Sequence, residues 1–435
     1  MHILMLALLS TITINEAILN TEIIENTNGQ WIAPGYRIAE EMILDIGEYG
    51  APLSYYGDIN TIGFHPFFVD TPDGEKWRIV LAYEGEIVVL QEGTAEKRFP
   101  ISGEIRSMIS SANGRYVLIG LKDEEQTQEE IIWSGYSPPE HRVILLDTDT
   151  GEQVTATGIR GAGLMGNDGS VVVIKPDVIE FYDNEMNLLG TASNFIIEMG
   201  GTATGYASEG SMLVRVHKED YNDPESFILR AYDRYGNILW VTDNEHYGYP
   251  MVSEHGEYAF VLKPGSLLCL DGSDGSLLWE QSHPDRTVYL TSASPNGAAC
   301  AYKTDLTPAE VRENPLRERF LMIGRVERDD TSRMTRIQFQ SERIRSMSIT
   351  SVTGDGFSLW IAYTGPGLDL SNYKICSFSP DGRLLFSKNV SRAGSQYTIT
   401  SAQSNLVISS NGPRIMWFDN EGVHIVTLEE ERGSE

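Results

Sequence analysis

The chain has 435 residues, with 62 acidic and 33 basic side chains, so its formal net charge is −29. A surface this acidic repels phosphate backbones, which excludes nucleic acid as an expected partner and favours a soluble monomer. The 41% apolar content supports a large core, and the many Gly (41) and Tyr (20) residues are typical of short strands joined by tight turns. The composition therefore predicts an ordered, all-β protein.

The N-terminus carries an apolar run from Ile3 to about Ile14. This run is too short to span a bilayer, and it is similar to the central region of a secretory signal. We expect residues 1–17 to be a signal peptide, which would place the protein outside the cytoplasm, in the periplasm or secreted. The alternative is a buried first strand. No other segment is apolar and long enough to cross a membrane.

A hairpin pattern recurs from about residue 60 onward. It reads "LLDTDTGEQV" at 145–154, "AYDRYGNILW" at 231–240 and "LDGSDGSLLW" at 270–279. Each copy has an apolar run, a polar turn with Asp and Gly, and a second apolar run, which predicts a β-hairpin. The residues that define these turns are Asp147, Gly151, Asp233, Gly236, Trp240, Asp271, Gly275, Trp279, Gly382, Asp419 and Gly422.

A second hairpin pattern precedes each of these copies, as in "SSANGRYVLIG" at 110–120 and "VSEHGEYAFVL" at 252–262. The two hairpins supply strands a–b and c–d of a four-stranded unit, and eight such units follow one another. The sequence therefore predicts a single β-propeller of four-stranded antiparallel blades, with eight blades favoured and seven as the alternative. We assign residues 61–430 to the propeller and 431–435 to a tail. Residues 18–60 form an extension that caps the channel or adds a closing strand, for which 40–47 is the candidate.

The "LDGSDGSLLW" and "LDTDTGEQV" hairpins resemble the repeats of pyrroloquinoline-quinone-like propellers, and "YDRYGNILW" is similar to WD40-like repeats of exported bacterial proteins. That superfamily includes quinoprotein dehydrogenases and cofactor-free scaffold propellers. Only Trp240 and Trp279 keep the repeat tryptophan, and the chain has no vicinal cysteines, so the resemblance implies the cofactor-free type. It implies the fold much more specifically than the activity.

The long connections fall between strands b and c, at 122–141, 217–226, 303–319 and 364–372, whereas the a–b and c–d turns are tight. Because alternate turns of a meander lie on opposite faces, the long connections should share one face, and loops carry binding residues. We expect this b–c loop face to bind a protein of the cell envelope or exterior. The candidate partner-binding residues are Trp133, Tyr136, Tyr221, Tyr302, Arg312 and Arg317.

Catalytic motifs with a contiguous signature are missing from the sequence, including G-x-S-x-G, H-E-x-x-H and the P-loop. The function predicted from sequence is therefore a non-enzymatic binding or scaffold module without a cofactor. The alternative is a propeller enzyme, of lyase or hydrolase type, with an active site gathered from several blades at the channel. "DTDTG" and "DGSDG" carry oxygen ligands of the kind that calcium takes, but hairpin turns explain them better. The sequence leaves open whether Cys269, Cys300 and Cys376 are free thiols.

Overall fold

The fold is seen in a computed structural model, in which every described secondary-structure element is a β-strand. It describes residues 13–19, 30–44, 64–121, 142–157, 159, 162–175, 177–194, 204–218, 227–242, 250–283, 288–294, 296–305, 320–327, 333–339, 344–353, 356–363, 372–391, 406–409, 414–419 and 422–431. The strands within these ranges form eight sheets, six with four strands and two with five.

Sheets 1 to 5 are each built from four consecutive strands in meander order. Sheet 1 contains β4 (Phe64–Thr71), β5 (Gly74–Tyr83), β6 (Glu86–Gln91) and β7 (Lys97–Pro100). Sheet 2 contains β8 (Ile105–Ser110), β9 (Tyr116–Leu121), β10 (Arg142–Asp147) and β11 (Gln153–Thr157). Sheet 3 contains β12 (Ala162–Met165), β13 (Val171–Ile174), β14 (Val178–Tyr182) and β15 (Leu188–Ser193). Sheet 4 contains β16 (Thr204–Tyr206), β17 (Met212–Lys218), β18 (Phe227–Asp233) and β19 (Ile238–Val241), and sheet 5 contains β20 (Met251–Val252), β21 (Tyr258–Lys263), β22 (Ser266–Asp271) and β23 (Leu277–Ser282).

Sheets 6 to 8 each include one strand from the N-terminal segment. Sheet 6 contains β24 (Val288–Ala293), β25 (Ala299–Asp305), β26 (Phe320–Glu327) and β27 (Arg333–Phe339), and β1 (Thr13–Leu19) pairs with β27 in parallel. Sheet 7 contains β28 (Ile344–Thr353), β29 (Gly356–Tyr363), β30 (Asn372–Phe378) and β31 (Leu384–Ser391), and β2 (Gln30–Ile32) pairs with β31 antiparallel. Sheet 8 contains β32 (Leu406–Ile408), β33 (Arg414–Asp419), β34 (Gly422–Glu430) and, as its fourth strand, β3 (Tyr36–Leu44).

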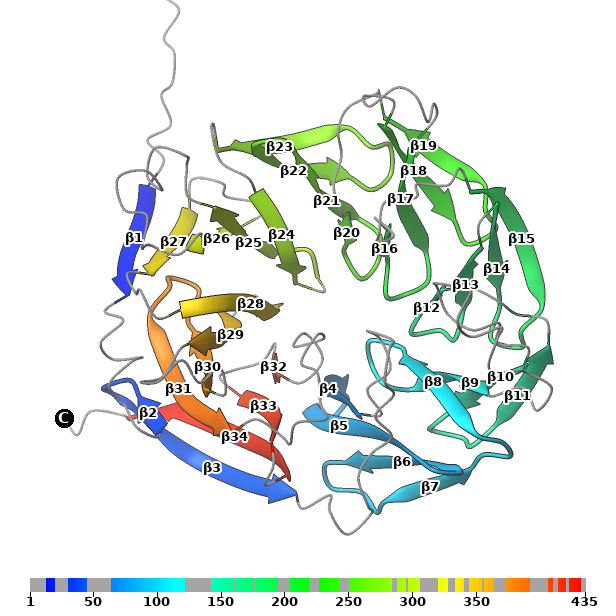
Figure 1. The fold of residues 1–435 in the computed structure, drawn as a ribbon, viewed down its shortest axis with the longest axis horizontal. Coiled ribbons are helices and arrows are strands. Elements are labelled where there is room, and N and C mark those ends of the chain that lie inside the picture. The colour runs from blue at the N-terminus through cyan, green and yellow to red at the C-terminus, as the bar shows by residue number, and fades with distance from the viewer. Residues whose placement is uncertain are drawn as a thin grey trace, which may run out of the picture.

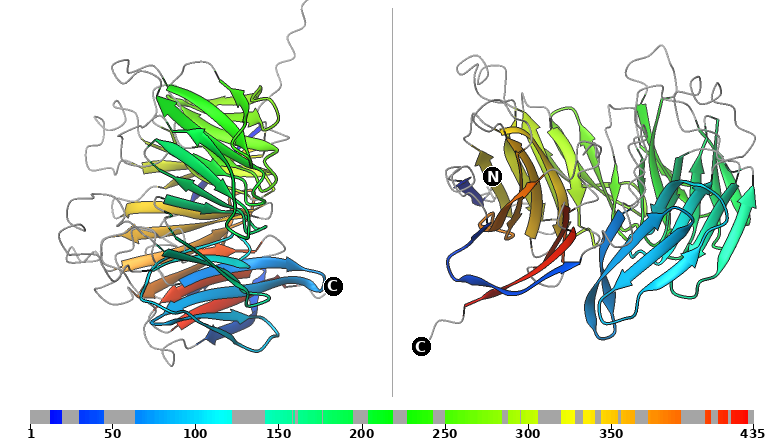
Figure 2. Two further views of the ribbon diagram at one scale, coloured as in Figure 1. Left: turned by 90° about the vertical axis from the view of Figure 1, so that its right-hand side faces the viewer. Right: turned by 60° about the horizontal axis from the view of Figure 1, so that its bottom comes forward.

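The sheets are arranged around a central axis, and in sheets 1 to 5 the first strand lies innermost and the fourth outermost, whereas β1, β2 and β3 are the outermost strands of sheets 6 to 8 (Figure 1). Seen from the side, the strands run across a flattened body, so their ends lie on two opposite faces (Figure 2). Middle strands such as β9 are buried on both sides because neighbouring sheets cover both faces, whereas the outer strand β11 alternates between exposed and half-buried residues. This is the packing of propeller blades, and the predicted all-β propeller is confirmed.

The first and last sheets are held together through the N-terminal segment. Trp77 and Ile79 of sheet 1 share a buried cluster with Met416 and Ile425 of sheet 8, and Met42 of β3 packs against it. The arrangement joins a strand from the beginning of the chain, β3, to one from its end, β34.

The last hairpin differs from the sequence interpretation. We expected Trp417–Val426, with its turn at Asp419 and Gly422, to join strands c and d. In the structure it joins β33 to β34, the second and third strands of sheet 8, because β3 supplies the fourth. The turn therefore lies on the opposite face from the one we predicted. The other turns with described strands on both sides join the strand pairs that we expected.

Residues 13–19, which overlap the end of the predicted signal peptide, form β1 on the outer edge of sheet 6. The region thus forms a strand, as the alternative of a buried first strand also expects. Export through a signal peptide stays a prediction.

Candidate functional site

The repeat aspartates shape the c–d turns. In sheet 4, one carboxylate oxygen of Asp233 accepts the amides of Tyr235 (2.8 Å) and Asn237 (2.9 Å). Partial burial alone would raise the pKa of Asp233, but the bonds from Asn237 and the turn amides outweigh it and hold that pKa below its usual value. In sheet 2, Asp147 likewise accepts a hydrogen bond from the amide of Asp149 (2.8 Å). These carboxylates build the turns, as the sequence predicted.

Trp240 joins neighbouring sheets. Its indole Nε1–H donates to the carbonyl oxygen of Gly272 in the turn of sheet 5 (2.7 Å). A Cβ on Gly275, which has a φ of +74°, would lie 2.8 Å from the Trp240 ring, so only glycine leaves room for the indole there. Trp279, the equivalent residue of sheet 5, lies beside Phe260, with 6.2 Å between ring centroids, and packs against a buried cluster that includes residues of sheets 5 and 6. Cys269, Cys300 and Cys376 are all buried.

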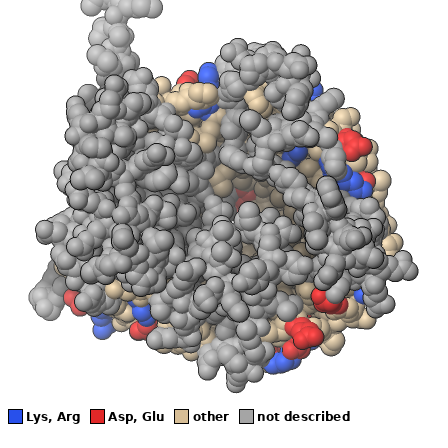
Figure 3. Space-filling view, in the orientation of Figure 1, with Lys and Arg blue, Asp and Glu red and all other residues tan. Residues whose placement is uncertain are grey.

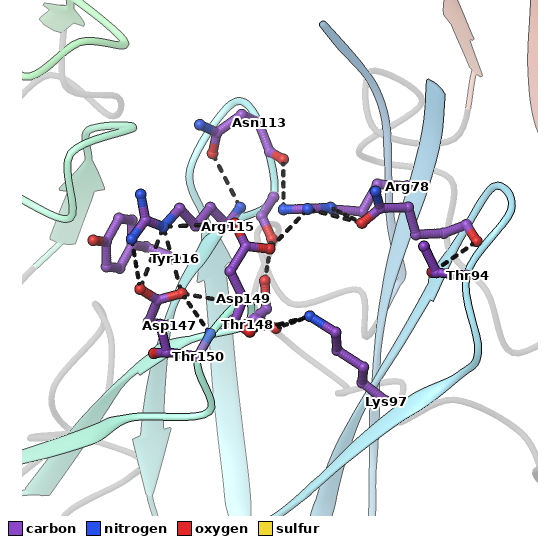
Figure 4. A network of polar contacts seen from close by, with 12 residues as sticks. Arg78, Thr94, Lys97, Asn113, Arg115, Tyr116, Asp147, Thr148, Asp149 and Thr150 are labelled. Atoms are coloured by element: carbon purple, nitrogen blue, oxygen red, sulfur yellow. Dashed lines mark hydrogen bonds and ion pairs between the residues drawn. The ribbon is translucent and has the colours of Figure 1, made fainter. Parts of the chain in front are cut away.

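The tight-turn face is cross-linked by polar contacts between sheets. Arg78 of sheet 1 pairs with Asp149 of sheet 2 (2.9 Å), and Lys97 donates to the carbonyl of Thr148 (3.1 Å). Within sheet 2, Arg115 pairs with Asp147 (2.8 Å), so the network runs unbroken from one sheet to the next (Figure 4). These side chains are committed to holding neighbouring turns in place.

The a–b turns interlock nearer the axis. Asn167 of sheet 3 accepts the amide of Asn113 of sheet 2 (2.9 Å), and the amide of Glu209 in sheet 4 donates to the carbonyl of Glu254 in sheet 5 (2.8 Å). Burial, and then the nearby charge of Glu209, raise the pKa of the Glu254 carboxyl. Viewed along the axis from the side of Figure 1, the molecule is hollowed at its centre, and acidic atoms are visible inside the hollow (Figure 3). No group of three metal-ligating side chains occurs among the described residues.

The predicted partner-binding residues divide into two groups. Trp133, Tyr136, Tyr221, Arg312 and Arg317 lie outside the described residues, so their role stays a prediction.

Tyr302 is the exception, and its assignment to a binding loop was wrong. It lies inside β25 with 1% of its surface exposed and stacks near His283, with 4.9 Å between ring centroids. The aromatic ring is part of the core between sheets 5 and 6 because β25 extends further along the chain than the sequence pattern indicated.

A cluster of basic side chains lies between sheets 3 and 4, and we did not predict it from the sequence. On β17, Val214 and Val216 face sheet 5, so the alternating residues Arg215 and His217 face sheet 3. Arg230 on β18 is directly opposite Arg215, and Tyr232 bonds His217 Nε2 through its hydroxyl (2.9 Å). The signal in the sequence was the Arg-x-His pair inside the apolar run "MLVRVHK".

The electrostatics of this cluster are dominated by burial. Arg215 is 5% exposed and donates to two neutral acceptors, Asn194 Oδ1 (2.9 Å) and Thr204 Oγ1 (2.5 Å). Burial, with the charges of Arg215 and Arg230, lowers the pKa of His217 to about 3, so the imidazole is neutral at neutral pH.

The scan of protein-family models and the search of curated proteins both find no match. Solved structures with a similar fold include BamB from Moraxella catarrhalis, at 12% identity and a TM-score of 0.49, covering 90% of this chain and 99% of that one. Hsv2 from Kluyvelomyces marxianus has 11% identity and a TM-score of 0.40, covering 69% and 88%. Hydrazine synthase from Kuenenia stuttgartiensis has 10% identity and a TM-score of 0.40, covering 87% and 100%. The propeller fold itself is shown by the sheets of the described residues and their arrangement around an axis.

Proposed function

We propose that this protein is a non-enzymatic protein-binding module that uses its b–c loop face. The observation that carries the proposal is that the ends of the described strands direct the long b–c connections to one face. Strands β9 and β10 pair along their lengths, with Leu121 opposite Arg142, so the connection 122–141 leaves from that end of sheet 2. The b–c connections 219–226, 306–319 and 364–371 leave from the corresponding ends of sheets 4, 6 and 7.

The connections from one sheet to the next leave from the same face. They include the segments 195–203, 243–249 and 392–405, because an antiparallel meander returns strand d to the side on which strand b ended. On the opposite face the described turns are tight, and those of sheets 1 and 2 are fixed by the network around Arg78, Arg115 and Asp147. A rigid ring with long connections on one side is typical of proteins that bind other macromolecules through loops.

The proposal extends to location. The apolar N-terminal run supports export to the periplasm or the exterior, where an envelope protein would be the partner. Among the described residues, no helix has the length and hydropathy needed to cross a membrane. Fractionation of cells that produce the full chain with a C-terminal tag tests this part, and retention in the cytoplasm would contradict it.

The binding face is tested by affinity capture with and without the loops. In the test variant, connections 122–141 and 306–319 are shortened to the length of the turn that joins β21 and β22. In the control variant, two Gly-Ser pairs are inserted after Asp274, in a turn on the tight-turn face. We expect shortening to release partners that the control retains. If every partner stays bound to the shortened protein, the assignment of the face is wrong.

A further inference from the structure

The outer edges of sheets 3, 4 and 5 carry a concentration of exposed apolar side chains. Among the described residues, eight large apolar side chains are exposed, and seven of them belong to the c–d turns or outer strands of these three sheets. They are Leu188, Tyr235, Ile238, Leu239, Val241, Leu277 and Leu278. Their strands β15, β19 and β23 follow one another around the rim (Figure 1).

These edges are continuous with one another. The carbonyl oxygen of Tyr235 in sheet 4 comes so close to Gly190 of β15 that a Cβ there would lie 1.9 Å from it. Trp240 of β19 contacts the turn of sheet 5 in the same way. The seven exposed apolar side chains thus lie on the c–d turns and outer strands of three successive sheets whose turns touch, and we call this set of residues the rim patch.

Equivalent positions of the repeat in sheet 7 are covered by the N-terminal segment. Leu384 and Leu385 of β31 precede Phe386 as Ile238 and Leu239 precede Trp240. In sheet 7, both leucines are only 5% exposed, because the N-terminal segment lies against the edge and the amide of Ala33 donates to the carbonyl of Leu385 (2.9 Å). In sheet 4, Ile238 is 53% and Leu239 45% exposed. The equivalent positions differ because an added strand, β2, is present in one sheet, and no described strand pairs with β19 on its outer side.

The edge of β19 also has no charged residue or proline of the kind that blocks the addition of another strand. The outer strand β7 of sheet 1 has Lys97, Arg98 and Pro100, which are typical of protected edges. The sequence of β19 is Ile-Leu-Trp-Val, without charge or proline. Because the amide of Thr242 donates inward to Leu229 (3.0 Å), the backbone N–H and C=O of the preceding residue, Val241, point outward.

We propose that β19 and the rim patch bind an extended segment of another protein, which adds to sheet 4 as a fifth strand. The segment would have alternating apolar side chains, to cover Ile238, Leu239 and Val241, and basic side chains between them. Exposed Glu185, Asp274 and Glu280 belong to the same turns and outer strands as the patch residues, and the chain carries a net charge of −29, so a cationic segment is attracted and a second acidic copy is repelled. This surface is separate from the b–c loop face and goes beyond the proposed function.

The test uses a capped nine-residue peptide of alternating Ile and Lys, labelled for fluorescence anisotropy, with the full-length protein. Val241→Pro removes the outward amide while leaving the inward ladder intact, and Leu239→Lys copies the protected edge of β7. Each change is expected to weaken peptide binding by about tenfold or more, as the loss of one good hydrogen bond would. The matched control, Thr155→Lys, alters an exposed position on the outer strand β11 and should leave binding unchanged.

Hydrogen exchange provides the second measurement, with protection of Val241 by the peptide as the expected result. Thermal unfolding of each variant separates lost binding from lost fold. The proposal is overturned if the peptide does not bind or if binding survives both β19 changes. It is also overturned if Leu239→Lys abolishes self-association or binding to neutral phosphatidylcholine vesicles, because the patch would then bind a second copy or a lipid surface instead of an extended peptide. The protein with shortened b–c loops should still bind the peptide, so a failure here is distinguishable from a failure of the loop-face proposal.

Discussion

Trp240 on the outer strand of sheet 4 donates its indole N–H to the carbonyl oxygen of Gly272 in the neighbouring sheet. The contact links two sheets that share no strand, so it contributes to the packing of the ring rather than to one sheet. Trp240→Phe keeps most of the buried ring and loses the bond, which should lower the free energy of unfolding by about 1 kcal/mol. Trp240→Ala should lower it by about 3–5 kcal/mol. Urea unfolding measures both, and an unchanged free energy of unfolding in Trp240→Phe would show that the bond is irrelevant.

Gly190 tests the close approach of sheets 3 and 4. A Cβ at this position would meet the backbone carbonyl of Tyr235, which cannot rotate away as a side chain could. Gly190→Ala is therefore expected to lower the free energy of unfolding by about 1–3 kcal/mol. The matched control is Gly163→Ala, whose Cβ would lie 3.2 Å from a methyl group of the Ile109 side chain. If both variants unfold at the same urea concentration as the wild type, the contact is looser than described.

Adjacent residues of β3 test how the last sheet is completed. Met42 packs into the cluster between sheets 8 and 1, whereas Ile43 is about half exposed. Met42→Lys should destabilise the protein by about 2 kcal/mol or more, because it places a charge in an apolar contact. Ile43→Lys should change stability by less than about 0.5 kcal/mol. The reverse order of effects in thermal unfolding would contradict the register of β3 against β34.

His217 predicts a loss of stability in acid. Its pKa is about 3 in the folded protein and about 6.5 when unfolded, so the unfolded chain takes up the proton first as the pH falls below 6.5. This group alone should remove about 2 kcal/mol of stability between pH 7 and pH 5, with full stability above pH 6.5. His217→Gln, which keeps a hydrogen-bonding side chain beside Tyr232, should flatten that slope in urea titrations.

The control for this prediction is His255→Gln at an exposed turn, which should retain the pH dependence of the wild type. An unchanged slope in His217→Gln would show that the buried imidazole does not titrate as its surroundings require.

The sequence predicts the repeated hairpins well because each turn is a local structure. Asp233 and Gly236 carry all the information that a tight turn needs within five residues, and the structure confirms it. The assignment of Asp419 and Gly422 was wrong for a non-local reason: the strand that completes sheet 8 lies near the opposite end of the chain, and nothing in the hairpin indicates its partner.

Buried polar residues were harder to predict than turns. Tyr302 was placed in a loop because it borders a polar segment, yet β25 keeps it inside the core. His217 was placed at the start of the connection 217–226, but β17 extends to Lys218, and alternation along a strand does not say that Arg215 and His217 face a neighbouring sheet. The candidate loop residues, among them Trp133, lie outside the described residues and keep their predicted role.

The central claim is that partners bind the b–c loop face rather than the face of tight turns. The most direct measurement is site-specific photo-crosslinking in cells, with a photoreactive amino acid in place of Trp133 on connection 122–141 or of exposed Ser273 on the tight turn of sheet 5. We expect a protein adduct from the first position and none from the second. An adduct from position 273 with none from position 133 would contradict the claim.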